Sequence, residues 1–357
     1  MTSTIKVSMN VEVMGCPTVC QHCWATGRHY QAMPLEDVSR VLEEVRRFCD
    51  AHGLAYGGYP MHEVVAHPQA AQVLQLFHEI WQVEFQPLPT TGVPLAIRPD
   101  WREILETLRE LNVSMLWLAF HGADEVHDRA VMRQGAYWES LHVIKLVREV
   151  GMKTGCNLFL TKENNWQFDK LIADLQQAGI HEIIPQVNSF TPNARGRHTE
   201  PLRPEWQNVE HLVEKLDAIP EACLWRRFWR ELPKMHTESW YVQQAEAGTW
   251  PDDGSWRREQ VTLVCRPNLD VYRGEHGQFV KHYGNLRHDG VDEVLNRARA
   301  DGVSSYEDIW FPGEPALSVQ ELGARFGDAQ SQRIHPQALS IRDWWMERAR
   351  RADRLHG

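Results

Sequence analysis

The sequence predicts an α/β protein built on a partial (β/α)6 parallel barrel, followed by a smaller mixed α+β extension. From residue 5 to about residue 200, short β-type runs alternate with helix-length amphipathic segments. Six such repeats imply a parallel sheet with right-handed crossovers, either open or curled into a partial barrel. The alternation ends near the Pro- and Gly-containing segment 192–204. We therefore expect a core domain at residues 1–200 and an extension at 201–357.

The expected strands are short, and the helices between them have recognisable ends. The strand segments are Ile5–Val13, Leu54–Gly57, Val83–Gln86, Ser114–Phe120, Lys153–Leu160 and Glu182–Val187. Helices are expected at 34–52, 68–81, 100–111, 137–150 and 164–178, with Pro, Asp or Asn at several starts and Gly beyond several ends. In the extension, Val261–Cys265 and Asp270–Tyr272 predict a hairpin turned by Pro267 and Asn268.

Composition is typical of an ordinary globular protein. The 357 residues are 43% hydrophobic and 24% charged. A formal charge of −10 disfavours a nucleic-acid partner, because such binding needs a basic face. The Arg-rich tail around Arg348 is interpreted as the polar face of a helix whose apolar side carries Ile341, Trp345 and Leu355. No apolar run approaches the roughly 20 residues that span a bilayer. We therefore expect a cytoplasmic protein with no membrane partner.

Cys16, Cys20 and Cys23 form a CxxxCxxC pattern in the loop after the first expected strand. In parallel sheets, functional groups gather in the loops at the carboxyl ends of the strands. Three thiolates within eight residues can bind three irons of a cubane cluster and leave the fourth iron open. A structural zinc site is the competing interpretation, with His22 or His29 as a fourth ligand. Because zinc ligands usually come as two separated pairs, the spacing favours a [4Fe–4S] cluster.

The stretch from Gly15 to Trp24 resembles the CxxxCxΦC loop of the radical SAM superfamily, with His22 at the commonly aromatic position. Further segments resemble family motifs in the same order. They are Glu63–Pro68 for the end of the GGEP-LxHP segment, Thr90–Gly92 for the TNG turn, Ala119–Arg129 for the SLHGAD and HDR segment, Asn157 and Thr161 on strand five, and Phe190–Arg197 for the turn after strand six. Met61 and His62 replace the two glycines that precede the glutamate in the family pattern.

This resemblance implies an enzyme in which one [4Fe–4S] cluster, held by the three cysteines, binds S-adenosylmethionine (SAM). One-electron reduction, by a donor such as flavodoxin or ferredoxin, would yield a 5′-deoxyadenosyl radical that abstracts hydrogen from the substrate. Glu63 would accept a hydrogen bond from the SAM ammonium group. The other positions that the resemblance assigns to the cofactor site are Ala119, His121, Arg129, Asn157 and Gln186. Since Ala119 replaces a serine common in the family, Arg129 or Arg133 would contact the SAM carboxylate instead.

Strand five also carries a cysteine, Cys156. Its alternation puts Asn157, Phe159 and Thr161 on one face and Cys156 and Leu158 on the other. If Asn157 faces the barrel interior, Cys156 faces the helices. We therefore expect Cys156 to be a core thiol and not a reactive one.

The segment from Cys265 to Tyr272, with Tyr283–Leu286 and Val291–Val294 after it, resembles the scaffold of a SPASM or twitch extension. The other cysteines of that extension are missing, and auxiliary clusters need several thiolates, so we expect none. Without a cluster to take an electron from the substrate radical, redox-neutral reactions such as epimerisation, rearrangement or elimination are favoured. Cys265 and Cys223 are candidate hydrogen donors, although each more often serves as a small buried hydrophobe.

Three functions stay open from the sequence. The favoured one is a radical SAM enzyme acting on a small sugar-like or other natural-product substrate, with stacking faces supplied by the tryptophan-rich stretch 225–256. The second is maturation of a ribosomal peptide, the commonest use of SPASM-like extensions. From a different class, the chain could be a non-catalytic zinc or Fe–S binding protein. Iron, sulfide and zinc analysis would separate this last function from the first two.

Overall fold

The structure, a computed structural model, describes most of the chain. The described residues are 6–23, 31–188, 190, 197, 199–210, 235–250, 260–274, 281–302, 317–336 and 338–356. The tryptophan-rich stretch is therefore only partly covered, and Trp225, Trp229 and Trp256 lie outside the described residues.

The core strands run parallel. They are β1 (Lys6–Met14), β2 (Ala55–Gly57), β3 (Pro60–His62), β4 (Leu88–Pro89), β5 (Met115–Phe120), β6 (Lys153–Phe159) and β7 (Glu182–Gln186). β2 and β3 pair with β1, whereas β4, β5, β6 and β7 pair with one another in that order. The predicted α/β class with a parallel sheet is confirmed.

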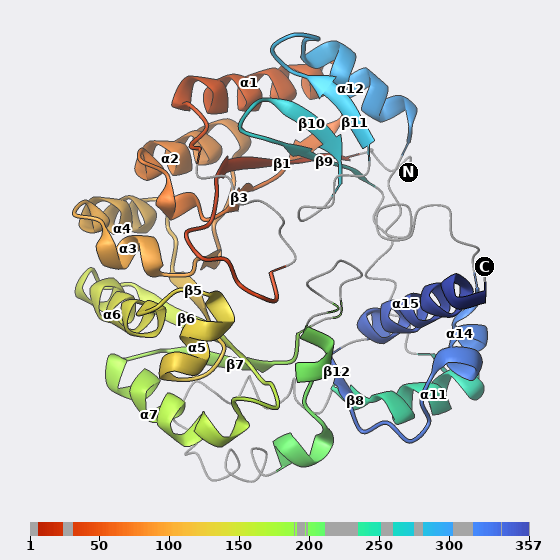
Figure 1. The fold of residues 1–357 in the computed structure, drawn as a ribbon. Helices are drawn as coiled ribbons and strands as arrows, with labels where there is room; N and C mark the ends of the chain where they lie inside the picture. The colour runs from red at the N-terminus through yellow and green to blue at the C-terminus, as the bar shows by residue number, and fades with distance from the viewer. Residues whose placement is uncertain are drawn as a thin grey trace.

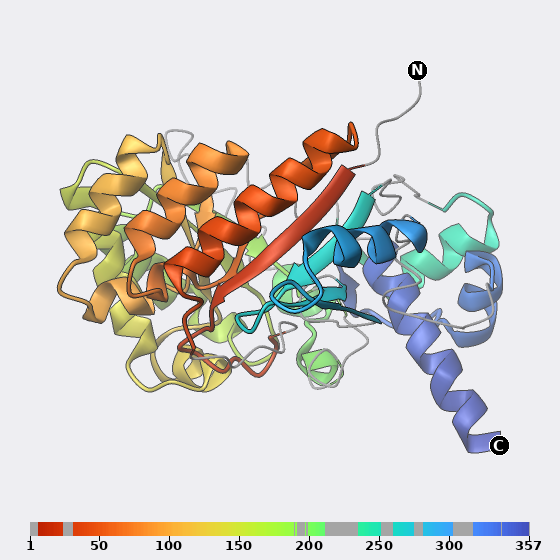
Figure 2. The same ribbon diagram turned by 90° about the horizontal axis from the view of Figure 1, so that it is seen from above.

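The helices lie in an arc outside these strands, as Figures 1 and 2 show. They are α1 (Leu35–Ala51), α2 (Ala70–Trp81), α3 (Val93–Ile97), α4 (Trp101–Glu110), α5 (Asp124–Val131), α6 (Ala136–Glu149) and α7 (Phe168–Ala178), with 3₁₀ turns at Val64–Ala66, Asn165–Gln167 and Glu200–Leu202. The five helices expected from the sequence are all present, most within two residues of their expected ends. The short α3 and α5 were not predicted.

β1 shows how the sequence separates the two faces of the sheet. Val7, Met9, Val11 and Val13 are buried in a core that α1 and α2 also line. The residues between them include Ser8, Asn10 and Glu12, so the opposite, inner face of the strand is polar. This alternation directs apolar side chains to the helices and polar ones to the barrel interior.

The inner face of β5 and β6 is filled where Trp117 pairs with Gly155. A Cβ built on Gly155 would overlap the Trp117 ring and would lie 2.9 Å from Met115 Sδ. The absence of a side chain at residue 155 therefore makes room for the indole that packs across the interior.

Gly155→Ala is expected to lower the free energy of unfolding by about 1–3 kcal/mol, because the half-buried Trp117 ring must shift. Gly57→Ala is a matched control, since its Cβ would meet the flexible Lys6 side chain at 3.3 Å; we expect a change within about 0.5 kcal/mol. Denaturant unfolding of both variants measures the difference. Equal stability of the two variants would contradict this packing role.

The predicted C-terminal hairpin is confirmed, and it joins the core sheet. β9 (Gln260–Cys265) and β10 (Asp270–Arg273) are antiparallel, and β11 (Lys281–Asn285) follows β10. β9 also pairs in parallel with β1, from Lys6 opposite Gln260 to Val11 opposite Cys265. α12 (Val291–Ala300) then packs into the same core as α1. The extension thus continues the sheet that begins the chain.

A group of helices completes the extension. α11 (Glu238–Glu246), α14 (Val319–Phe326) and α15 (Ala338–His356) share a separate core, and β8 (His236–Thr237) pairs with β12 (Ile334–His335) beside them. The predicted terminal helix is α15, with Ile341 and Trp345 buried. Arg348 Nη1 donates to the buried Glu238 Oε1 at 2.7 Å, so this arginine has an internal partner.

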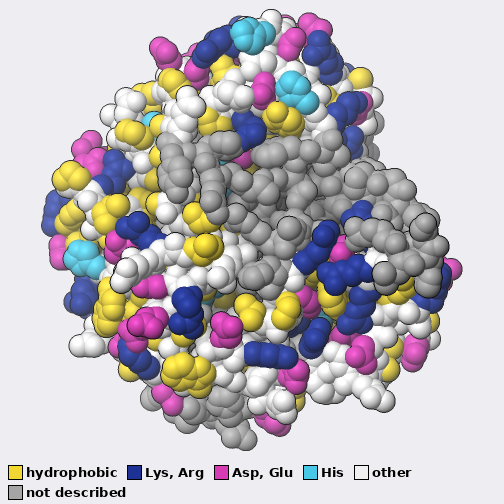
Figure 3. All heavy atoms as spheres, viewed as in Figure 1, with side chains coloured by type: hydrophobic (Ala, Val, Ile, Leu, Met, Phe, Trp, Pro, Cys, Tyr) yellow, Lys and Arg dark blue, Asp and Glu magenta, His cyan; other side chains and the backbone are white. Residues whose placement is uncertain are grey.

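Lys and Arg side chains gather near α15 on the face in Figure 3, whereas the rest of that face is mixed. Among the described residues, no helix has the length and apolar character required to cross a bilayer.

The third expected strand, Val83–Gln86, was misplaced. Gln82 adopts a left-handed conformation that ends α2, and the strand forms only at Leu88–Pro89. Val83 and Phe85 are nevertheless buried, which explains their strand-like pattern. β4 lies at the edge of its sheet, where prolines are tolerated.

Candidate functional site

The cysteine loop leaves the carboxyl end of β1 and is fixed to α5. Val19 N donates to Val131 O at 3.1 Å, and Gln21 N donates to Ala130 O at 2.9 Å. The Thr18 hydroxyl lies between two thiols, 3.1 Å from Cys16 Sγ and 3.4 Å from Cys20 Sγ. All three cysteines of the loop are half-buried. Burial and then the negative charge of Glu63 raise the pKa of the Cys16 thiol to about 12, so metal binding there must displace a proton.

Glu63 is buried behind this loop, only 2% exposed. Thr90 Oγ1 donates to its Oε1 at 2.7 Å, and Thr91 N donates to its Oε2 at 2.6 Å. Burial raises the pKa of the Glu63 carboxyl, while these hydrogen bonds oppose the shift. A buried carboxylate with two fixed donors still has lone pairs for a further cationic donor.

Three of the other predicted cofactor residues, Ala119, Asn157 and Gln186, fall on one face of β5, β6 and β7. Ala119 pairs with Asn157, and Phe159 pairs with Gln186. Because laterally paired residues point to the same side of a sheet, these side chains share the inner face on which Ala119 and Phe159 border a cavity. Gln186 Oε1 is buried and accepts no hydrogen bond from the described residues.

Cys156 lies on the opposite face, as expected. It is fully buried in the core that contains Leu171 and Leu175 of α7. Burial raises the pKa of this thiol. Cys156 is therefore a packing residue of the helix side.

Aromatic and histidine rings stack at the ends of β5 and β6. The centroids of the His121 and Phe159 rings lie 4.7 Å apart, and the two rings are nearly parallel. The ring of His22, which belongs to the cysteine loop, has its centroid 3.9 Å from that of His121. His121 N donates to His127 Nδ1 at 3.2 Å. Burial lowers the pKa of His121 well below its usual range and that of His127 to about 4. Both rings are therefore neutral near pH 7.

Asn164 holds the backbone of two residues of this ring stack in place. Its amide donates to His121 O at 2.9 Å and to Phe159 O at 2.6 Å, and it joins the ends of the two strands. The sequence suggested only that Asn164 or Asn165 caps a helix. The available signal was an asparagine in the loop after a strand, but nothing in the sequence identifies its hydrogen-bond partners.

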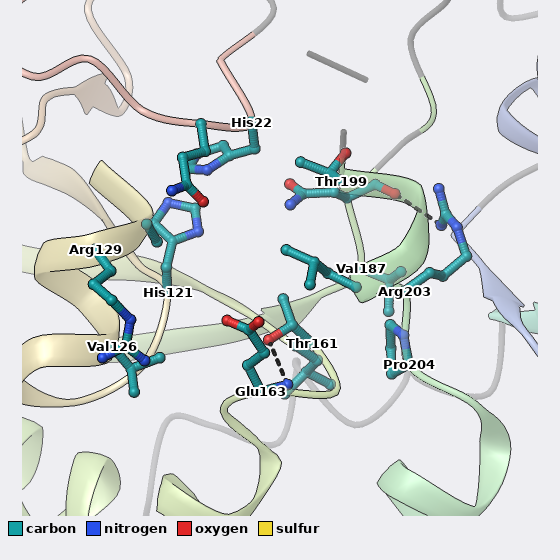
Figure 4. A pocket seen from close by; sticks show the side chains of 15 residues that line it. His22, His121, Val126, Arg129, Thr161, Glu163, Val187, Thr199, Arg203 and Pro204 are labelled. Carbon is teal, nitrogen blue, oxygen red and sulfur yellow. Dashed lines mark hydrogen bonds between the residues drawn. The ribbon is translucent and has the colours of Figure 1, made fainter. Parts of the chain in front are cut away.

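Two cavities meet at the histidine pair. We call the first, of about 630 Å³, the cluster-side cavity, which is bordered by Cys20, Cys23, Thr91, Ala119 and Phe159. We call the second, of about 820 Å³, the outer cavity, which is bordered by Arg129, Thr161, Glu163, Val187 and Thr199 (Figure 4). The side chains common to both linings are His22, His121 and Asn188. Molecules bound in the two spaces would meet at this shared wall.

Of the two candidate hydrogen donors, Cys265 borders neither cavity. Cys265 is fully buried in the core shared with α1, and its neighbour on β1 is the outward-facing Val11. Burial, followed by the charge of Glu12, raises the pKa of the Cys265 thiol. Its side chain thus faces the helices, whereas a hydrogen donor has to reach the substrate. Cys223 lies outside the described residues.

The donor set fits an iron–sulfur cluster with bound SAM. Three thiols in one loop, a buried carboxylate behind them and an orphan amide oxygen at Gln186 surround the same end of the barrel. No three His, Cys, Asp or Glu side chains in the described part of the chain converge on a single metal ion. A cubane does not require such convergence, because each thiolate binds a different iron.

Comparisons with known proteins agree with this site. The model of the radical SAM superfamily matches residues 13–175, from the end of β1 into α7, which includes the whole cysteine loop. No match was found among curated proteins.

Solved structures share the fold at low sequence identity. His-tagged anSMEcpe with bound AdoMet (SAM) has a TM-score of 0.54 at 12% identity, covering 97% of each chain. Native anSMEcpe with bound AdoMet and Kp18Cys peptide gives 0.54 at 12%, covering 99% of each. Streptococcus suis SuiB bound to precursor peptide SuiA gives 0.47 at 14% over 75% of this chain, which spans 58% of the SuiB chain. The two anSMEcpe structures therefore show that this chain shares their fold.

Proposed function

We propose that this chain is a radical SAM enzyme in which Cys16, Cys20 and Cys23 hold a single [4Fe–4S] cluster for hydrogen abstraction from a substrate, because the radical SAM superfamily model matches residues 13–175. When bound and reduced, the cluster and SAM would supply a 5′-deoxyadenosyl radical. The observation that carries the proposal is the three-thiol loop, two of whose cysteines border a cavity that is also lined by Thr91, a hydrogen-bond donor to the buried Glu63. The other residues at the site would bind and orient SAM and the substrate and enclose them.

Glu63 is proposed to bind the SAM ammonium group. Thr90 and Thr91 hold its two oxygens in place, so the carboxylate is oriented before any ligand arrives. A charge-assisted hydrogen bond to such a preoriented group is stronger than a neutral one. Asn157 and Gln186 would offer polar contacts on the inner face, and the small Ala119 leaves room beside Asn157. His121 would form part of the cavity wall, and Arg129 would be the cation available to the SAM carboxylate.

The outer cavity is proposed to receive the substrate. Arg129 and Glu163 bring opposite charges to its lining, and Thr161, Asn188 and Thr199 add neutral polar groups. This lining suits a polar small molecule, such as a sugar derivative, better than an apolar one. The lack of further cysteines around Cys265 favours a redox-neutral outcome such as epimerisation, rearrangement or elimination.

Glu163→Gln tests this assignment. With any compound that raises 5′-deoxyadenosine formation by the wild type, the variant is expected to need about fivefold more compound, because an exposed charge contact is worth about 1 kcal/mol. The KM for SAM should not change. Glu125→Gln on α5, exposed and away from the lining, is the control. A raised KM for SAM would instead assign the outer cavity to the cofactor.

A peptide is the second candidate substrate. Native anSMEcpe, which shares the fold across nearly the whole chain, is described with a bound peptide as well as AdoMet. Compounds of both classes should therefore be offered to the enzyme. Stimulation by peptides alone would replace the small-molecule assignment.

The function itself is tested by reducing the anaerobically reconstituted full chain in the presence of SAM. We expect 5′-deoxyadenosine to accumulate. The electron can come from a chemical reductant or from a flavodoxin or ferredoxin. Metal analysis on the same sample addresses the non-catalytic alternative. Stoichiometric zinc without 5′-deoxyadenosine would contradict the enzymatic function and indicate a zinc-binding protein.

A further inference from the structure

His62 ends β3 directly before Glu63, and its backbone has an unusual conformation. Its φ of 64° lies in the left-handed region, which disfavours residues that carry a Cβ. In the family pattern this position is a glycine, which adopts such a φ without strain. The chain therefore needs some other interaction to hold residue 62 in this conformation.

The side chain of His62 supplies that interaction. His62 Nε2 lies 3.0 Å from Glu12 Oε1, and the two side chains are only 5% and 1% exposed. Glu12 stands on the polar, inner face of β1, two residues before Met14, which pairs with His62 in the sheet. The contact thus ties the end of β3 to β1 at the base of the cysteine loop.

Glu12 is held in turn by the C-terminal extension. Its second oxygen, Oε2, lies 3.3 Å from Arg266 Nε. The register that sets Val11 opposite Cys265 brings Arg266 next to Glu12. Arg266 N also donates to Asp270 O at 2.9 Å in the β9–β10 turn, so the arginine is fixed at its backbone.

We propose that Glu12, His62 and Arg266 form a positioning triad that fixes the backbone before Glu63 and so sets the affinity for the SAM ammonium group. The triad performs the task that glycine conformational freedom performs in the family pattern. It also makes the hairpin of the extension part of the SAM site, through one arginine. The inference rests on the proposed function, since it assigns Glu63 to SAM.

The test compares His62→Gly with His62→Ala. Both variants lose the contact to Glu12, but only alanine keeps a Cβ in the left-handed conformation. The dissociation constant for SAM is measured by equilibrium dialysis of radiolabelled SAM against the cluster-loaded full chain. We expect the alanine variant to bind SAM at least about fivefold more weakly than the glycine variant. The rate of 5′-deoxyadenosine formation at saturating SAM should be the same for both.

Equal dissociation constants for SAM in the two variants would overturn the proposal that the triad positions Glu63. If the alanine variant does not fold, Arg266→Gln decides instead, because this side chain is 22% exposed and lies at the edge of the contact. It should raise the dissociation constant about threefold, and an unchanged constant would overturn the proposal. Arg287→Gln is the matched control, since Arg287 ties the same extension to Asp37 of α1 at 2.7 Å, away from Glu12. If the wild type itself binds no SAM, the proposed function fails and not the triad alone.

Discussion

Cys20→Ala is expected to remove the cluster and all SAM cleavage while leaving the fold intact. Cys20 is one of the three proposed ligands, and it packs against the small group of Val93, Val131 and Ala136. Two remaining thiolates do not hold a cubane. Reconstituted wild type should contain about four irons per chain and the variant close to none. Iron and sulfide analysis with the absorbance spectrum measures this difference.

Cys156→Ala is the matched control for that experiment. Cys156 is one strand residue away from the inner face but points into the helix-side core. We expect it to keep its iron and its 5′-deoxyadenosine formation, at a modest cost in stability. Full iron content in Cys20→Ala, or a loss of iron in Cys156→Ala alone, would be incompatible with the assigned ligands.

Glu63→Gln is expected to weaken SAM binding strongly. The substitution keeps the size of the side chain and a carbonyl oxygen for Thr90, but it removes the negative charge opposite the ammonium group. Loss of a hydrogen bond to a charged group costs about 1.5–3 kcal/mol, which corresponds to a roughly 10- to 100-fold rise in the KM for SAM. Initial rates of 5′-deoxyadenosine formation across SAM concentrations measure it.

The control for Glu63 is Glu79→Gln. Glu79 is exposed on the outer face of α2 and should leave the KM for SAM unchanged. Thermal unfolding of the cluster-free proteins separates a binding defect from a folding defect. A KM in Glu63→Gln equal to that of the control would remove Glu63 from the site.

The elements that the sequence predicted well are those that depend on local pattern. β1, β5, β6 and β7 follow alternation over several residues, and their expected ends lie within one residue of the observed ones. The outward orientation of Cys156 followed from the same alternation. The proposed cysteine ligands could be recognised from their spacing alone, because all three come from one loop.

The parts that were missed depend on contacts between distant segments. Nothing in residues 260–265 indicates that they pair with residues 6–11, since strand register is not encoded by either segment alone. The same holds for the bond between Glu12 and His62. The sequence did carry a signal, a single acid among the inner-face residues of β1 and a histidine at a glycine position, but only the fold joins them. β4 was misplaced because burial of Val83 and Phe85 imitates a strand.

Electron paramagnetic resonance of the reduced protein, with and without SAM, tests most directly whether the cysteine loop holds a cluster with an open iron. Wild type should give the signal of a reduced [4Fe–4S] cluster, and saturating SAM should change that signal, because a ligand at the open iron alters its surroundings. Cys20→Ala should give no cluster signal. A cluster signal that saturating SAM leaves unchanged would contradict the account.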